Sequence, residues 1–166
     1  MFRNTLIILF LLLTITVSQA ETVLNIGEPP PPLSLTNLKG TPVSLKESLG
    51  KETIILSFFA SWSKSCQAEI AFLQALAAKH KPQQLKIIAV SFDRKISELQ
   101  TFITQNNLDL EFWTDKKLVS LKDYRILILP TLFIIDRNGN LKNTYVDFDD
   151  NIKQAVEQEI TTLLAK

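Results

Sequence analysis

Apolar and polar residues follow one another with different spacings along this chain, and two stretches are almost entirely apolar. They are residues 53–60, TIILSFFA, and residues 85–92, LKIIAVSF. Runs rich in β-branched and aromatic residues are typical of strands that are buried on both faces of a sheet. The two runs therefore predict two central strands.

Four other segments carry apolar residues three and four positions apart, which is the spacing of one helix face. They are residues 66–79, 96–107, 115–124 and 149–165. In the first segment Ile70, Leu73 and Leu76 form the apolar face. The second ends in two asparagines, which are common just past a helix end. The third is long enough for only a short helical piece.

Two hairpins are predicted from turn residues between strand-like stretches. Residues 33–45 alternate apolar and polar residues around a turn at Lys39-Gly40. Residues 131–136 and 141–148 flank the sequence RNGN, in which Asn-Gly is a strong signal for a two-residue turn. Residues 21–33 are rich in proline and predict an extended lead-in, because proline neither pairs inside a sheet nor continues a helix.

The order of these elements predicts the fold class. A strand–helix–strand half precedes a strand–strand–helix half, and such connections place helices on both faces of a central sheet. With 166 residues and 46% hydrophobic content, the chain can bury one sizeable core. We therefore expect a single α/β domain over residues 21–166.

The first twenty residues have the layout of a secretory signal peptide. Arg3 precedes an apolar run over residues 6–17, and the small residues Ser18 and Ala20 stand before a cleavage point at Glu21. The run is short for a bilayer span, which needs about 20 residues. We expect an exported protein, periplasmic or otherwise extracytoplasmic, with membrane attachment only if the segment stays uncleaved.

Charge and residue counts narrow the classes of function. The 18 basic and 17 acidic residues leave no positive excess for a nucleic-acid partner. One histidine and one cysteine cannot fill a typical metal site, and the four glycines form no phosphate-binding loop. The sequence thus predicts no metal, no cofactor and no nucleic acid.

Three segments in order carry a resemblance to a known family. They are IGEPPPPLSLTNLKGTPVSLKESLGK, FFASWSKSCQAEI and LPTLFIIDRNGNL. The second is similar to the motif Phe-Trp-Ala-x-Trp-Cys-x-x-Cys-x-x-Glu of the TlpA/ResA-type redoxins. These are exported members of the thioredoxin-like superfamily, related to the AhpC/TSA redoxins. The resemblance implies a thioredoxin-like fold: a central mixed β-sheet flanked by helices on both faces, with an N-terminal β-hairpin extension.

The same resemblance implies roles for individual residues. Trp62 stands at the tryptophan before the active site, Ser63 at the first, nucleophilic cysteine, and Cys66 at the second cysteine. Pro130 stands at the proline whose preceding peptide bond is cis in the family. In relatives the residue before it, here Leu129, pairs with the backbone of a bound substrate. The resemblance therefore implies a protein or peptide partner in a groove near Pro130.

The chain also departs from the family pattern around the site. Arg125 and Ile128 replace two glycines that commonly precede the proline, and Gln67 replaces a basic residue. A serine at position 63 cannot become a disulfide sulfur, which excludes two-cysteine exchange. His80 does not activate it, since the far end of the helix is roughly 20 Å away at 1.5 Å per residue.

Serines at positions 63 and 65 are also candidate helix N-caps, whatever the function. For Cys66 three roles remain open: a small apolar residue of the core, a lone reactive thiol, or a peroxidatic cysteine. Lys64 and the helix N-terminus would favour the thiolate. The sequence Ser-Lys-Ser-Cys resembles the Thr-x-x-Cys motif of peroxiredoxins, but their later arginine is replaced near Pro130.

Two functional hypotheses follow. The first is a binding module that holds an extended peptide in the groove around Trp62, Cys66 and Pro130. The second is an oxidoreductase that works through the single thiol of Cys66, with one-cysteine peroxidase activity as the alternative. Two carboxylates, Glu69 and Asp93, are further acid–base candidates, but isolated carboxylates near element ends are expected to be solvated or paired with lysine.

Overall fold

The computed structural model describes residues 24–80 and 84–165. Its strands are β1 (Ser34–Asn37), β2 (Pro42–Ser44), β3 (Thr53–Phe59), β4 (Leu85–Ser91), β5 (Glu111–Thr114), β6 (Thr131–Ile135) and β7 (Leu141–Val146). Its helices are the 3-10 helix Leu45–Glu47, α1 (Lys64–Lys79), α2 (Ile96–Gln105), α3 (Ser120–Asp123) and α4 (Asp150–Leu164). The predicted signal peptide, residues 1–20, lies outside the described residues.

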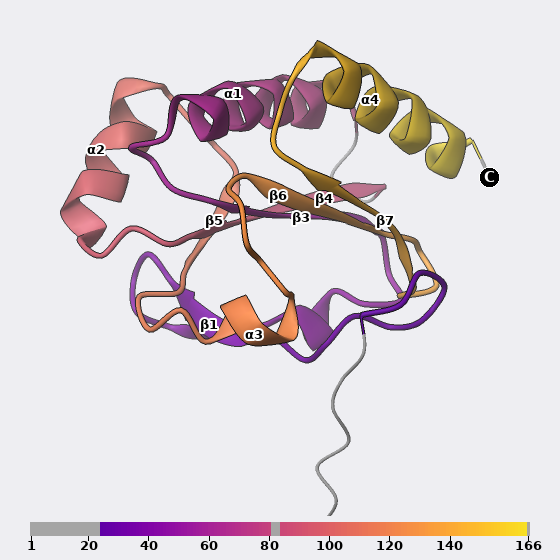
Figure 1. Cartoon of the computed structure of the whole chain (residues 1–166), viewed down its shortest axis with the longest axis horizontal. Coiled ribbons are helices and arrows are strands. Elements are labelled where there is room, and N and C mark those ends of the chain that lie inside the picture. The colour runs from indigo at the N-terminus through magenta and orange to yellow at the C-terminus, as the bar shows by residue number, and fades with distance from the viewer. Residues whose placement is uncertain (1–23, 81–83, 166) are drawn as a thin grey trace, which may run out of the picture.

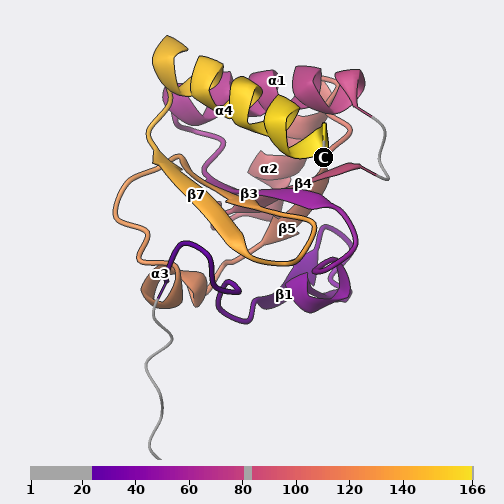
Figure 2. The same ribbon diagram turned by 90° about the vertical axis from the view of Figure 1, so that its right-hand side faces the viewer.

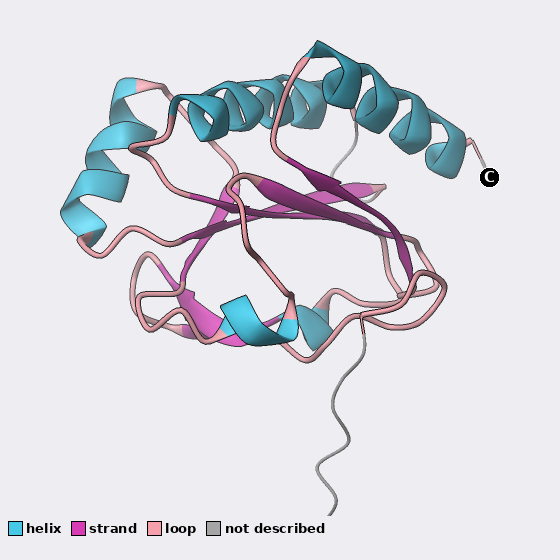
Figure 3. Ribbon diagram, in the orientation of Figure 1, coloured by secondary structure: helices cyan, strands magenta, loops and turns pink. Residues whose placement is uncertain are grey.

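The strands form one mixed sheet in the order β2-β1-β5-β4-β3-β6-β7. β3, β4 and β5 are parallel, whereas β6 runs antiparallel to β3 and β7 antiparallel to β6. The β1–β2 hairpin extends the far edge by pairing antiparallel with β5. Figures 1 and 3 show this sheet edge-on between its layers. The predicted α/β, thioredoxin-like fold is confirmed.

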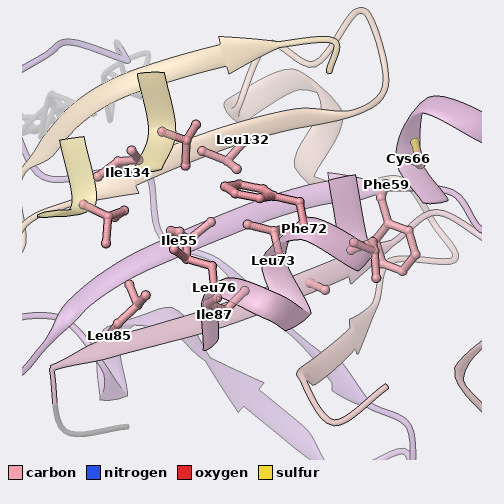
Figure 4. Packing of buried hydrophobic residues seen from close by; sticks show 14 of the residues in the cluster. Ile55, Phe59, Cys66, Phe72, Leu73, Leu76, Leu85, Ile87, Leu132 and Ile134 are labelled. Atoms are coloured by element: carbon pink, nitrogen blue, oxygen red, sulfur yellow. The ribbon is translucent and has the colours of Figure 1, made fainter. Parts of the chain in front are cut away.

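Helices cover both faces of the sheet, as the sequence predicts. α1, α2 and α4 lie on one face, and α3 lies on the other (Figure 2). Each face has its own apolar core, and β3 contributes alternate residues to the two. Ile55 and Phe59 point to the α1 side, whereas Ile54, Leu56 and Phe58 point to the α3 side. Figure 4 shows the α1-side core, which reaches Cys66.

Some local predictions differ from the structure. β5 was not predicted, because its four residues follow an exposed loop and carry one polar residue at each end. The turn between β6 and β7 is longer than a two-residue loop: Asp136 accepts bonds from the backbone N–H groups of Asn138 and Asn140. Gly139 completes it at φ 86°, a left-handed conformation that glycine adopts without strain.

No helix within the two described ranges is long and apolar enough to cross a membrane.

Tyr124 fastens the proline-rich lead-in to the α3-side core. Its ring is buried against Phe58 and Phe133, and its Oη donates a 2.6 Å bond to the carbonyl of Pro31. Tyr124→Phe should lower the free energy of unfolding by about 1–2 kcal/mol, because it leaves a buried carbonyl without its donor. Urea unfolding with an unchanged m-value checks this, and a loss under about 0.5 kcal/mol would contradict it.

Candidate functional site

The site is built where β3 ends and α1 begins. Ser63 is the N-cap of α1: its side chain accepts a bond from the backbone N–H of Cys66 at 3.5 Å, and its carbonyl accepts from the N–H of Gln67 at 2.9 Å. A serine oxygen here satisfies one of the N–H groups that the first helical turn leaves unpaired. The capping role predicted for one of the two serines is thus confirmed for Ser63.

Cys66 lies in the first turn of α1 and faces inward. Its side chain has no exposed surface and belongs to the α1-side core, with Phe59 nearby in Figure 4. Burial raises the pKa of the Cys66 thiol above its ordinary value, and the hydrogen bond with Ser63 offsets this only in part. The expected help of Lys64 and the helix N-terminus is therefore outweighed, because a buried thiolate loses its hydration.

The thiol of Cys66 should accordingly react slowly. Alkylation by iodoacetamide at pH 7 is expected to be more than about tenfold slower in the native protein than in urea, because both thiolate formation and access require opening of the core. Mass spectrometry of timed samples measures the rate. Equal rates in the two states, or a native pKa below that of a free cysteine, would contradict the burial of a neutral thiol.

Asp93 organises the loop that leads into α1. This carboxylate is buried and accepts bonds from the Ser61 backbone N–H at 3.1 Å and from the hydroxyls of Ser61 and Ser91 at 2.9 and 2.6 Å. Gln67 closes the same loop from the helix side, since its Nε2 donates to the Ser61 carbonyl at 2.7 Å. The expectation of a solvated or lysine-paired Asp93 was wrong, because serine hydroxyls satisfy the carboxylate inside the protein.

Glu69 was also expected at the surface, and this too was wrong. One turn after Cys66, its side chain is 1% exposed and accepts a 2.6 Å bond from the Ser57 hydroxyl of β3. Burial raises its pKa from 4.5 to about 8, so a neutral carboxyl lies beneath the site at neutral pH. Glu69 stands at the glutamate of the redoxin motif, which is the sequence signal that could have marked it as more than a surface residue.

The resemblance placed Trp62, Leu129 and Pro130 together, and the structure brings their segments side by side. β6 is the antiparallel neighbour of β3, so the segment before β6 faces the loop after β3. The peptide bond between Leu129 and Pro130 is cis. Trp62 is 72% exposed, whereas Leu129 is half-buried and Pro130 is buried. Of the three residues, only Trp62 therefore presents most of its side chain to the solvent.

The neighbouring chain segments are fixed by two further bonds. The carbonyl of Pro130 accepts from the Asp147 N–H at 2.8 Å, and the Ser65 hydroxyl donates to the Asp147 carboxylate at 2.7 Å. This second bond lowers the pKa of Asp147. The end of β7 is thereby tied both to the segment before β6 and to the first turn of α1.

One of the two residues that replace glycines of the family pattern has a backbone conformation that is typical of glycine. Arg125 adopts φ 49°, in the left-handed region where glycine is favoured. The second residue that replaces a glycine is Ile128, and its side chain is 54% exposed. Its carbonyl accepts a 2.6 Å bond from the Thr131 hydroxyl. The segment before Pro130 therefore carries an apolar surface where many relatives have little side chain.

His80 lies away from this surface. It is the C-cap residue of α1, at the opposite end of the helix from Ser63, as the sequence predicts. Among the residues that the structure describes, no group of three or more histidine, cysteine or acidic side chains is arranged to hold a metal ion.

Comparison with known proteins now adds to this geometry. A model of the AhpC/TSA family matches residues 26–144, well over half of the chain. The chain belongs to the AhpC/TSA family. Within this redoxin family it is similar to the thiol-disulfide oxidoreductase ResA of Bacillus thuringiensis subsp. konkukian. The two are 31% identical over 121 residues, which cover 73% of this chain and 69% of the relative.

Two further comparisons connect the chain with thioredoxin-like proteins. The thioredoxin-like protein YneN of Bacillus subtilis is 28% identical over 148 residues, covering 87% of this chain and 84% of the relative. The crystal structure of a putative thiol:disulfide interchange protein DsbE from Chlorobium tepidum has a TM-score of 0.79 at 30% identity. The matched region covers 86% of this chain and 99% of the chain in that crystal structure. This member of the AhpC/TSA family is thus a thioredoxin-fold protein that is similar to thiol-disulfide oxidoreductases.

Proposed function

We propose that this protein is an exported, peptide-binding redoxin that lacks two-cysteine chemistry. One contrast carries the proposal: the single thiol, Cys66, is wholly buried, whereas Trp62, four residues earlier, is 72% exposed. A redox site requires an accessible thiolate. A binding surface requires exposed anchors, and aromatic rings are the commonest of these.

The backbone beside the cis bond supports the same function. Within residues 24–80 and 84–165, neither the N–H nor the C=O of Leu129 takes part in a hydrogen bond. An extended segment of a partner could pair with both groups through its own backbone, in the manner of a short added strand. Trp62 would then contact the partner's side chains, while Pro130 forms the floor.

Export is part of the proposal because of the N-terminal segment. The apolar run over residues 6–17 and the small residues before Glu21 support secretion. If the segment is retained instead of cleaved, the same domain would be held at the outer side of the cytoplasmic membrane.

Monothiol chemistry and one-cysteine peroxidase activity at Cys66 have weaker support. Both need a thiolate that reaches its oxidant or its partner, and burial opposes both its formation and its access. Ser63 cannot supply a resolving sulfur.

The decisive experiment compares two substitutions. Extended peptides with an apolar centre are selected from a library on the native protein, and their affinity is then measured by calorimetry. Trp62→Ala should weaken binding by about tenfold or more, as expected for an aromatic anchor. Cys66→Ala should change the affinity by less than about twofold, because the thiol is covered.

A matched control uses the second tryptophan. Trp113 is 1% exposed on β5, so Trp113→Phe should leave the affinity unchanged while it removes the buried fluorophore. Binding can then be followed through Trp62 emission alone. The opposite result is that Cys66→Ala abolishes binding or biological activity while Trp62→Ala is tolerated. That result would contradict this proposal and favour monothiol chemistry.

A further inference from the structure

Six of the seven large apolar side chains that the described residues expose gather at one end of the sheet. The seven are Ile26 (60%), Trp62 (72%), Leu118 (39%), Val119 (55%), Leu127 (93%), Ile128 (54%) and Val146 (47%). All except Ile26 lie in loops after β3 or β5, before β6 or at the end of β7. β3 and β5 run parallel and β6 antiparallel, so these positions share the end of the sheet at which the parallel strands finish. We call these six residues the apolar end.

Exposed charges at the same end are sorted by sign along the sheet. Arg94 and Lys95 follow β4, and Lys116 and Lys117 follow β5. The strand order puts these residues on one side of β3 and β6. Asp147, Asp149 and Asp150, which follow β7, lie on the other side.

Other charges nearby do not cancel this order. Glu98 pairs with Lys95 at 2.9 Å and offsets that one cation. Asp93 and Asp115 are buried and bonded to serine hydroxyls, so they add little to the surface. Lys64 and Arg125 add positive charge near the middle, and Lys153 stands on the first turn of α4 among the acids. The end of the sheet is therefore positive on the β5 side and negative on the β7 side. Trp62, Leu127 and Ile128 lie between the two sides, whereas Leu118 and Val119 lie beside the lysines and Val146 lies beside the acids.

We propose that this surface is the interface of a two-fold symmetric homodimer. A two-fold axis that lies in the interface, perpendicular to the row of strand ends, reverses the order of charges in the second copy. The β5 side of each copy then meets the β7 side of the other, and the two apolar centres cover each other. A second copy is the occupant favoured here because the chain itself carries the charge order and the apolar centre that the surface requires.

This dimer is an addition to the proposed function and does not depend on it. It covers Trp62 and the segment before Pro130, so self-association and peptide binding compete for one surface. The apparent affinity for a peptide should therefore fall as the protein concentration rises.

The association should be weak and sensitive to salt. Six exposed apolar residues make a small interface, at the low end of the areas that specific complexes bury. We expect a Kd of about 10–100 μM, as for transient complexes of this size. Because exposed charges orient the two copies, raising ionic strength should weaken the dimer.

Sedimentation velocity between about 2 and 200 μM tests the proposal on protein that was expressed with its own N-terminal segment and processed by the cell. The wild type should shift from monomer to dimer, and Trp62→Ala should raise the Kd by about tenfold or more. The double variant Lys116→Glu, Lys117→Glu makes both sides negative and should be monomeric. Adding Asp150→Lys and Asp147→Lys inverts the order and should restore association.

Each outcome decides for or against this interface. A wild type that stays monomeric at 200 μM overturns the proposal, as does a dimer that neither Trp62→Ala nor charge reversal weakens. A dimer that Trp62→Ala weakens but salt and charge reversal leave unchanged overturns the charge-ordered arrangement. Thermal unfolding of every variant verifies that the fold is kept. No peptide enters these measurements, so their failure would leave the peptide-binding proposal standing.

Discussion

Raising the pH from 4.5 to above 8 is expected to lower the free energy of unfolding by about 4 kcal/mol through Glu69 alone. Burial raises the pKa of this carboxyl from 4.5 to about 8 in the folded protein. In the unfolded chain the group is hydrated and titrates near its ordinary value. Between these two pKa values the folded state holds one proton more than the unfolded state.

The direction of the effect follows from proton linkage. A state that holds the extra proton is favoured when protons are abundant, so stability from Glu69 is fully present below about pH 4.5. It declines as the pH rises and is lost above the folded pKa of about 8. There the native state must either bury a carboxylate or unfold around it.

The variant Glu69→Gln isolates this contribution. Glutamine keeps a polar group for the Ser57 hydroxyl but has no proton to lose, so urea unfolding at several pH values should show a flatter profile. The control Glu98→Gln alters an exposed carboxylate beside Lys95 and should keep the wild-type slope. Parallel pH profiles for Glu69→Gln and wild type would show that Glu69 ionises freely in the folded protein.

Restoring a second thiol should have the largest effect on activity. Ser63→Cys places a sulfur three residues before Cys66 at the start of a helix. The distance between the two Cα atoms there is close to the value of about 5.5 Å that is usual across a disulfide. The new thiol stands at the helix N-terminus, which favours its thiolate. We expect this variant to form an intramolecular disulfide and to reduce insulin measurably, and we expect no turnover by the wild type.

The matched control is Ser65→Cys. It adds a thiol in the same turn but directly next to Cys66, where the Cα spacing of about 3.8 Å is too short for an ordinary disulfide. Its insulin activity should stay at background. Turnover by the wild type at a rate comparable to that of Ser63→Cys would show that the single thiol suffices, and the interpretation of Ser63 as a lost nucleophile would then be wrong.

The sequence predicted the elements whose patterns are long and regular. β3 and β4 were recognisable because a strand buried on both faces needs apolar residues at nearly every position. β5 was not predicted, because a strand of four residues is too short to show a clear pattern of apolar and polar positions. Its place between β1 and β4 depends on pairing with residues more than seventy positions away, such as Thr36 with Thr114.

The sequence named candidate site residues but did not predict the electrostatics around them. The resemblance to the family motif marked Trp62, Ser63 and Pro130 as candidates, but it gave no distances or exposure for them. The burial of Glu69 could not be deduced from its helix alone, because its partner Ser57 lies twelve positions earlier on another element. The raised pKa of the Cys66 thiol likewise depends on how closely the β3 strand and α1 pack, which no local pattern reports.

Asp93, Ser61 and Gln67 hold the chain between β3 and α1 by hydrogen bonds from side chains that do not change their oxidation state. A disulfide in this position would make the shape of the loop depend on the balance of oxidants and reductants in the surrounding medium. Here the loop should keep one conformation in glutathione buffers of any composition. A partner would then meet the same surface whether the surrounding medium is oxidising or reducing.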